Sequence, residues 1–496
     1  MSRIRGMRGY LSSSIGVVCA TALALPLTLP ATPASASARP AETRPATEAP
    51  AVPVAAAAPA VPGSTQSLPL APRPGDRTLG PAAEQGLYRP DVRHFSLVGV
   101  IWDNPDTELY GKVQVRTREA AGGHWSGWQD VETHNHEHSA DPDTAERVSG
   151  RVRGSTAPLW VGDSDGVEVR VRADGEGRAS ETRSPLPAGM RLELVDPGMA
   201  PADPAGQPAR TTEPTGQTGQ PGQEGQEGQT GSRGTTETEY ATASARSAAE
   251  SAAANGDLAP LGATEIPALD RQRTEEEALT LRGQEARPEE RQVTPYIGPR
   301  PRIVTRRGWG ADEGLRESGF VYTKTVKAAF VHHTASGNKY WCSEVPSLIR
   351  SIYRYHVESS GWRDIGYNFL VDRCGNIYEG RAGGVAKPVM GAHTLGFNTN
   401  SMGIAVLGTF VDSKPSKRAV GAIARLTAWK LGLFGGNPNG KTYLTSGGGN
   451  LYPKGKNVRL NVISGHRDGF ATECPGRLLY GRLGSARKSA AAYQGR

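Results

Sequence analysis

The stretch Ala328-Ala329-Phe330-Val331-His332 indicates the fold class of the C-terminal part of this chain. Four consecutive apolar residues that end in a histidine are typical of a buried strand whose last side chain meets a polar site. Three further runs predict buried strands, at Asn368–Asp372, Gly403–Leu407 and Val462–Gly465. Amphipathic periodicity predicts two helices, at Glu344–Glu358 and Ala419–Leu431. Strands that alternate with helices predict a mixed α/β sheet with helices packed on it, over residues 301–486, and a tail at 487–496.

Composition predicts that only part of the 496 residues forms compact domains. Apolar residues make up 37% of the chain and aromatic residues 6%, while 62 glycines and 37 prolines interrupt it. Such averages predict folded blocks separated by polar linkers. The formal net charge of +7 hides a division, because the residues from Pro301 onward carry 28 basic and 11 acidic side chains. We therefore expect the C-terminal domain to attract an anionic partner. We expect no nucleic-acid partner and a monomeric chain.

Residues 1–38 have the pattern of a secretory signal peptide. A basic start precedes the apolar run Ile15–Leu29, and Ala34-Ser35-Ala36 offers small residues for cleavage. No later stretch is apolar enough to span a bilayer. We expect a secreted protein, extracellular or associated with the cell wall, that keeps no integral membrane segment after cleavage.

Residues 88–198 predict an all-β, sandwich-like domain, because short runs of alternating apolar and polar residues are separated by turn-forming residues. The expected strands are Phe95–Trp102, Tyr110–Arg118, Leu159–Val161, Val167–Ala173 and Met190–Val195. Alternation would place Val167, Val169 and Val171 on a core face and turn Glu168 toward water.

The segments on either side of this domain are expected to lack a core. Residues 39–87 are rich in alanine and proline and predict a disordered leader, and residues 199–300 predict a linker rich in Gly, Gln, Pro and Glu. Glycine recurs at every third position from Gly216 to Gly234, but so few triplets favour a flexible spacer over a collagen-like helix. Two stretches, Ser244–Ala254 and Glu275–Leu281, favour transient helix.

Three side chains of the C-terminal domain suggest a metal site. His332 ends one predicted strand, His466 follows another, and Cys474 lies eight residues further on. Two imidazoles and a thiolate can fill three of the four tetrahedral positions of Zn²⁺, and a fourth position left to water is what distinguishes a catalytic zinc from a structural one. Zinc would also hold Cys474 as a thiolate. From these residues alone two alternatives stay open, namely histidines that only pack and a Cys474-Pro475-Gly476 segment that only turns.

Five short motifs follow one another between residues 302 and 480: Phe330–Ala335, Asp364–Phe369, Gly391–Thr394, Asn398–Ile404 and Gly465–Gly476. Together with Trp309-Gly310-Ala311 they resemble the peptidoglycan recognition protein family, which is grouped with the zinc N-acetylmuramoyl-L-alanine amidases (amidase type 2). The resemblance implies that His332, His466 and Cys474 hold Zn²⁺ as the cofactor.

The resemblance also implies two catalytic residues. Tyr367 matches a family tyrosine near the metal, whose phenol would orient the attacking water or stabilise the developing oxyanion. Thr472 matches a position that makes a polar contact to the tetrahedral intermediate. Without the family, Tyr367 is more simply a core aromatic residue with a satisfied hydroxyl. No carboxylate is marked by its position as the proton donor to the leaving amine.

Five positions match residues that line the substrate cleft of the family: His356, Gly361, Trp362, His393 and Asn398. Relatives with Gly-Trp at this place tend to prefer diaminopimelate-type stem peptides. Gly361 would leave room for the extra carboxylate, and Trp362 would offer a flat packing wall. The alternative is an ordinary loop with one partly buried tryptophan.

Cys342 and Cys374 are the remaining cysteines of the expected mature chain, and we predict a disulfide between them from their number and the oxidising compartment.

These features predict a secreted, zinc-dependent N-acetylmuramoyl-L-alanine amidase that hydrolyses the amide bond between the lactyl group of N-acetylmuramic acid and L-alanine of the stem peptide. The main alternative is a non-catalytic peptidoglycan-binding protein of the same fold. Many non-catalytic relatives lack the cysteine ligand, so Cys474 together with Tyr367 favours catalysis. A third hypothesis is an adhesion or scaffold protein that depends on the β domain and the linker.

Two weaker signals lie in the β domain. His134, His136 and His138 would place three imidazoles on one face of a strand, as in a metal site, but their polar neighbours favour a solvated loop. Trp125 and Trp128 suggest either a sugar-stacking surface or part of a core.

Overall fold

The computed structural model describes residues 63–73, 84–174, 185–199, 233–283 and 296–496. The expected signal peptide at 1–38 and most of the glycine triplets lie outside the described residues. Within the described ranges, no helix combines the length and the apolar character needed to cross a membrane.

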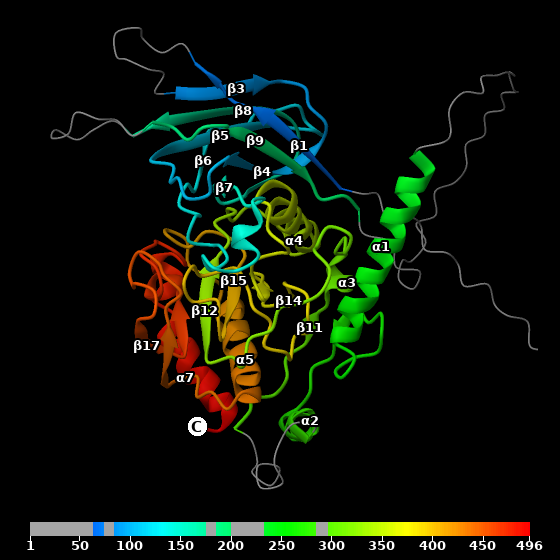
Figure 1. Ribbon diagram of the computed structural model, residues 1–496, viewed down its shortest axis with the longest axis vertical. Coiled ribbons are helices and arrows are strands. Elements are labelled where there is room, and N and C mark those ends of the chain that lie inside the picture. Colours follow the sequence, from blue (N-terminus) through cyan, green and yellow to red (C-terminus); the bar gives the residue numbers. More distant parts are fainter. Residues whose placement is uncertain (1–62, 74–83, 175–184, 200–232, 284–295) are drawn as a thin grey trace, which may run out of the picture. The chain divides into compact units, whose positions relative to one another are not determined.

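The C-terminal domain contains a seven-stranded sheet with the order β10-β11-β14-β13-β15-β12-β18 (Figure 1). Its strands are β10 (Glu265–Ile266), β11 (Ile303–Val304), β12 (Ala328–His333), β13 (Phe369–Val371), β14 (Ile377–Glu379), β15 (Ser401–Val406) and β18 (Ile463–Gly465). The pairs β10–β11 and β13–β14 are antiparallel, and the other neighbours are parallel. This mixed sheet confirms the predicted fold class, and all four predicted strands are present.

Two helices cover one face of this sheet and leave the other face to the site. Helix α5 (Lys417–Leu433) begins after Ser416, whose Oγ accepts a hydrogen bond from the backbone N–H of Ala419 at 3.0 Å. With α7 (Leu483–Gln494) it packs against Ala329 and Val331 of β12. Because side chains alternate along a strand, His332 points to the opposite face.

That opposite face is covered by three elements. Helix α4 (Val345–Arg354) continues into the π-helical turn Tyr355–Ser359, and its apolar residues pack on Ala405 of β15. The hairpin of β16 (Lys441–Thr445) and β17 (Asn457–Asn461) covers the N-terminal half of β12. The C-terminal half of β12, with His332, lies between these covers.

The N-terminal domain is a nine-stranded antiparallel β structure. Its strands are β1 (Ser64–Pro69), β2 (Ala71–Pro72), β3 (Glu84–Arg89), β4 (Phe95–Trp102), β5 (Gly111–Glu119), β6 (Gln129–Val131), β7 (Gly154–Ser155), β8 (Leu159–Ala173) and β9 (Arg191–Asp196). The first part of β8 pairs with β4 and its last part pairs with β3 and β5, so one long strand replaces two predicted ones. The prediction for Glu168 was wrong, because this side chain is buried and its carboxylate is paired with Arg73 and Arg116.

The predicted leader at 39–87 was wrong where the structure describes it. Strand β1 pairs in register with β9, from Ser64 with Asp196 to Pro69 with Arg191. Its sequence, Ser-Thr-Gln-Ser-Leu-Pro, lacks an apolar alternation, and the backbone of β9 supplies its pairing. A strand of this kind leaves little signal in sequence periodicity.

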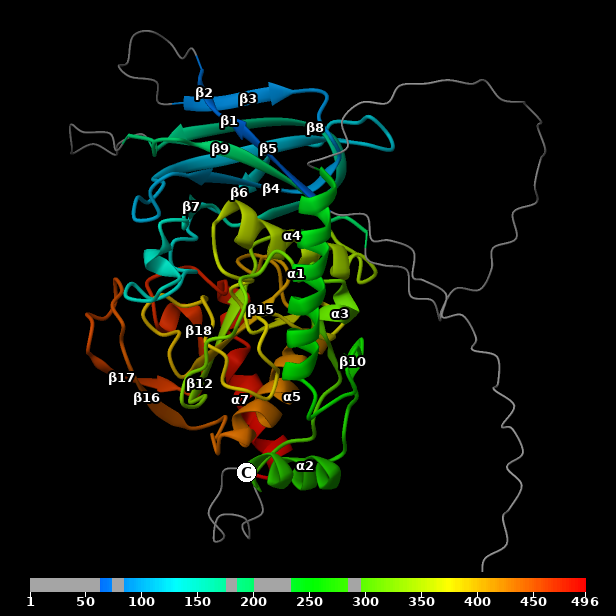
Figure 2. The same ribbon diagram turned by 45° about the vertical axis from the view of Figure 1, so that its right-hand side comes forward.

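The predicted linker at 199–300 was also wrong over its C-terminal half. Helix α1 (Arg233–Ala254), strand β10 and helix α2 (Arg271–Gly283) belong to the C-terminal domain. After α1, the side-chain amide of Asn255 donates to the buried carboxylate of Glu379 at 2.9 and 3.0 Å. Near α2, the guanidinium of Arg271 donates to the carbonyl of Tyr493 in α7, so the predicted tail is part of the fold (Figure 2).

Candidate metal centre and cleft

Three predicted donors meet at the C-terminal ends of the neighbouring strands β12 and β18. His332 is at the end of β12, His466 directly follows the neighbouring strand β18, and Cys474 lies in the loop that leads to the next helical turn. Both histidines are fully buried, and Cys474 is almost so. The structure therefore brings together the predicted set His332, His466 and Cys474.

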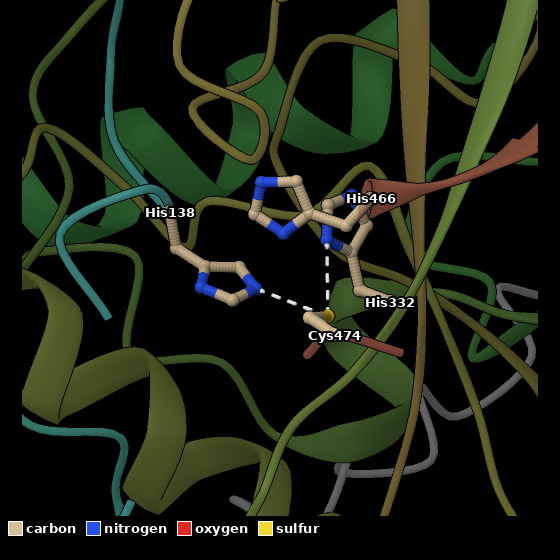
Figure 3. Close-up of side chains that lie close together, drawn as sticks. All are labelled: His138, His332, His466 and Cys474. Carbon is tan, nitrogen blue, oxygen red and sulfur yellow. Dashed lines mark hydrogen bonds between the residues drawn. The ribbon is translucent and has the colours of Figure 1, made fainter. Parts of the chain in front are cut away.

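A fourth donor, His138, joins them from the N-terminal domain (Figure 3). Its Nε2 lies 3.6 Å from the sulfur of Cys474, and Nδ1 of His332 lies 3.8 Å from the same sulfur. The four donor atoms all lie within 4.8 Å of one another. Three nitrogens and one sulfur thus converge on a single point.

The chemistry of this donor set fits a zinc ion. With Zn–N bonds of about 2.0 Å and Zn–S bonds of about 2.3 Å, tetrahedral ligands lie roughly 3.5 Å apart. Among the described side chains, both ring nitrogens of His466 and Nδ1 of His138 are buried without a hydrogen-bond partner. A cation in the cluster can take one nitrogen from each ring, so it would satisfy one of the His466 nitrogens, which without it would carry a desolvation cost. Nδ1 of His138 lies outside such a site, because Nε2 is the nitrogen beside the sulfur.

Electrostatics also favour metal binding by these side chains. Burial holds the pKa of His138, His332 and His466 well below 6.5, and neighbouring imidazoles lower it further. The rings are therefore neutral and offer a lone pair at physiological pH. Burial raises the pKa of the Cys474 thiol well above its usual range, so a positive charge is needed to hold it as a thiolate.

The sequence left the fourth position to water, and the structure brings the imidazole of His138 into the same group of donors. The run of three histidines was the signal that could have indicated this, but its polar neighbours favoured a solvated loop. That prediction was wrong for Asn135 and Glu137–Asp141, which are buried. The segment that follows β6 is not a strand. His136 lies instead with its ring 5.7 Å from that of Phe470 and its Nδ1 3.6 Å from Glu108, while only His138 reaches the donor cluster.

Tyr367 lies beside the cluster, where the family resemblance places it. Its ring centroid is 5.5 Å from that of His332 and 6.0 Å from that of His138. Burial, followed by the nearby Cys474 and Glu137, raises the pKa of this phenol well above 10. Tyr367 therefore keeps its proton and can act as a hydrogen-bond donor.

Thr472 contacts the cysteine loop, and its contact to the tetrahedral intermediate stays a prediction. Its hydroxyl accepts a hydrogen bond from the backbone N–H of Cys474 at 3.1 Å and donates to the carboxylate of Glu137 at 2.6 Å. The carboxylate is buried, and burial raises its pKa. In this arrangement Thr472 positions the cysteine loop.

The five predicted cleft residues come together, but other groups cover them. His356 stacks on Trp362 with ring centroids 4.3 Å apart, and Asn398 accepts the backbone N–H of His393 at 2.8 Å. Gly361 has φ +75°, which favours glycine, and a Cβ there would lie 2.0 Å from the carbonyl oxygen of Arg151. The room that Gly361 was expected to leave is thus taken by the N-terminal domain.

The remaining cysteines form the predicted disulfide between Cys342 and Cys374. In the part of the chain that the structure describes, Cys474 is the free cysteine.

The tryptophans Trp125 and Trp128 lie outside the hydrophobic core of the N-terminal domain, with the guanidinium of Arg116 over both rings and that of Arg170 over Trp128.

Comparison with known proteins places this site in a family. Residues 322–477 match the family described as N-acetylmuramoyl-L-alanine amidase. Peptidoglycan-recognition protein SC2 of Drosophila simulans is 33% identical over 184 residues, which make up 36% of this chain and 84% of that protein. The chain belongs to the peptidoglycan recognition protein family. Residues 45–208 match a second family, the Rv3811 N-terminal galactose-binding domain-like family, so the recognition-protein domain is joined to a different β-rich domain.

Two further matches lie in the same part of the chain. Peptidoglycan-recognition protein LE of Drosophila melanogaster is 38% identical over 126 residues, or 25% of this chain and 35% of that protein. A solved structure of human PGRP-IBETAC in complex with glycosamyl muramyl pentapeptide is 30% identical, covers 36% of this chain and 93% of that one, and superposes with a TM-score of 0.29. The family contains both amidases and non-catalytic recognition proteins, and membership does not assign this chain to either group.

Proposed function

We propose that this protein is a secreted, zinc-dependent N-acetylmuramoyl-L-alanine amidase of the cell wall. The observation that carries the proposal is the convergence of His332, His466 and Cys474 beside the protonated phenol of Tyr367. When bound, zinc would supply a water molecule of lowered pKa and would polarise the amide carbonyl.

The chain's own residues would perform the remaining tasks. The phenol of Tyr367 would donate a hydrogen bond to the oxygen on which negative charge develops, a contact commonly worth about 3–4 kcal/mol in the transition state. Thr472 would hold the cysteine loop through the N–H of Cys474. Burial of both histidines excludes water from their free nitrogens and keeps the rings neutral.

The proposed amidase would act on peptidoglycan with a diaminopimelate-type stem peptide. The names of the relatives support peptidoglycan as the ligand. The excess of basic residues after Pro301 favours an anionic polymer. Gly361 and Trp362 support the stem type by resemblance, once the N-terminal domain residues that lie against Gly361 are displaced. The disulfide between Cys342 and Cys374 supports secretion, since such bonds persist in oxidising compartments.

Digestion of diaminopimelate-type sacculi tests the proposal. The zinc-loaded chain and its His138→Ala variant are incubated with sacculi, and new N-terminal alanine is measured on the released peptides. We expect such peptides from at least one of the two proteins, and their loss when Cys474→Ser is added. Absence of product from both proteins, or unchanged product with Cys474→Ser, would contradict an amidase.

A second candidate function is peptidoglycan binding without cleavage. The observation that favours it is His138, because a zinc with four protein ligands is the mark of a structural site. This candidate predicts that the chain and the His138→Ala variant sediment with sacculi while neither releases peptides.

A further inference from the structure

The connection between β6 and β7 crosses the predicted substrate cleft. We call residues 132–153 the covering segment; it begins after Val131 and ends before Gly154. Most of its central residues, including Glu137, His138 and Asp141, are buried. A solvated loop would be exposed, so the central part of this segment is docked, whereas residues 148–151 are exposed.

Contacts on both sides of His138 hold the segment in place. The carbonyl of Glu137 accepts the N–H of Leu395 at 2.9 Å, and the carbonyl of Ser139 accepts the side-chain amide of Asn398 at 2.9 Å. The carboxylate of Asp141 accepts from the same amide at 2.7 Å and from the N–H of Gly396 at 2.8 Å. The position of His138 is therefore fixed by its neighbours as well as by the donor cluster.

A buried ion pair anchors the far end of the segment. Glu146 pairs with Arg381 through two hydrogen bonds of 2.8 and 2.9 Å, and both side chains are almost fully buried. Glu146 also accepts the N–H of Arg363, and the carbonyl of Arg151 lies against Gly361. The segment thus takes up hydrogen-bonding groups that an anionic ligand in the cleft would otherwise meet.

We propose that His138 is the fourth ligand of the metal site, and that the covering segment keeps the amidase latent while it is docked. The latency rests on the proposed amidase function, whereas the ligation of the metal by His138 does not depend on it. Four protein donors leave no position for water or for a carbonyl oxygen. Asn398, Gly361 and Arg381 are meanwhile held by the chain itself. Displacement of the segment frees both the metal position and the cleft.

Cobalt substitution in the full-length chain tests the ligation without turnover. Co²⁺-loaded wild type, His138→Ala and the control His136→Ala are titrated with azide, and the visible absorption spectrum is recorded. We expect no change for wild type and His136→Ala, and a saturable change for His138→Ala, in which an exchangeable position has opened. A wild-type spectrum that responds like that of His138→Ala overturns the fourth ligand.

Rates on sacculi test the latency. We expect His138→Ala to release peptides at least tenfold faster than wild type and His136→Ala to match wild type. The double variant Asp141→Ala/Glu146→Ala keeps all four donors but loses the anchors. It should therefore show both the azide response and a faster rate, and it replaces His138→Ala in the test if that variant cannot hold cobalt. Equal or slower rates in both variants overturn the latency. Absent cleavage with the expected spectra overturns only the amidase.

Discussion

Two groups of buried polar side chains compensate the cost of their burial in opposite ways. Arg306 donates to Glu313 at 2.7 and 3.2 Å and to Asp364 at 3.1 Å, and all three side chains are almost inaccessible to solvent. In the donor cluster, His466 and His138 are equally buried, yet three of their ring nitrogens have no partner among the described residues.

The difference shows which of the two groups is complete by itself. Opposite charges at hydrogen-bonding distance compensate one another's desolvation, so the Arg306 network needs only protein atoms. Neutral imidazoles and a neutral thiol that converge on one point carry no opposite charges, so they cannot compensate one another's desolvation in this way. Their burial is compensated only when a cation is bound among them. The network should therefore respond to substitution alone, and the donor cluster to the concentration of zinc.

Removal of zinc should give the largest effect. A free zinc concentration a thousandfold above the dissociation constant stabilises a folded chain by about 4 kcal/mol, and zinc-free protein lacks this contribution. We expect the urea midpoint to fall after chelation and to return when zinc is added back. Magnesium serves as the control cation, because it prefers oxygen ligands and should not restore the midpoint. Identical unfolding curves with and without zinc would contradict a site that is completed by a cation.

Arg306→Ala should destabilise the fold by about 3–4 kcal/mol, because Asp364 would remain buried without this counter-charge, while Glu313 would keep its pair with Arg316 at 2.7 Å. Zinc stoichiometry should stay unchanged in the folded variant. Arg302→Ala is the matched control, since its 2.9 Å pair with Glu265 is exposed and should contribute less than about 1 kcal/mol. Urea unfolding with zinc analysis measures both quantities. Equal losses of unfolding free energy in Arg306→Ala and Arg302→Ala would contradict the larger contribution expected of the buried network.

Glu379 lies beside the Arg306 network and should make its stability depend on pH. Burial raises the pKa of this carboxyl from 4.5 to about 7. The folded chain then keeps a proton that the unfolded chain has released, so the contribution is present below pH 4.5 and is lost as the pH rises through 7. Glu379→Gln should reduce the loss of unfolding free energy with rising pH by about 2–3 kcal/mol. Urea unfolding at several pH values checks it, and parallel profiles for variant and wild type would contradict the raised pKa.

Thr472→Val should give the smallest effect. The variant loses the acceptor for the N–H of Cys474 and the donor to Glu137. Partners behind metal ligands commonly change metal affinity by 10–100-fold, and we expect about tenfold weaker zinc binding here. Thr472→Ser keeps the hydroxyl and should restore the affinity in a competition titration with a chelating dye. A Thr472→Val variant that binds zinc as tightly as wild type would contradict a role for the hydroxyl.

Sequence reasoning succeeded where burial leaves a periodic signal. The apolar run that ends at His332 predicted β12, and the valines from Val167 to Val171 predicted a core strand, which the structure confirms with both ends buried. Strand β1 was missed, and α1 was predicted only as transient helix at Ser244–Ala254, because both attach through backbone pairing and polar contacts such as Asn255 with Glu379. Such contacts do not require a periodic pattern of apolar residues in the attached segment.

The candidate site was predictable only for the residues that belong to the C-terminal domain. His332 lies in β12, and His466 directly follows the edge strand β18, which pairs in parallel with β12, so the ends of these two strands meet. Cys474 follows in the loop after β18. His138 lies in a connection between β6 and β7 without regular structure, and only the packing of one domain on the other brings it to the sulfur of Cys474. No spacing within one domain could reveal that contact.

X-ray absorption at the zinc edge of the full-length, zinc-loaded protein tests the central claim most directly. The account predicts one zinc per chain with one sulfur at about 2.3 Å and three nitrogens at about 2.0–2.1 Å. In His138→Ala, one of the three imidazole contributions should be replaced by a light atom from solvent. A zinc surrounded only by oxygen, or a spectrum without a sulfur shell, would contradict the claim.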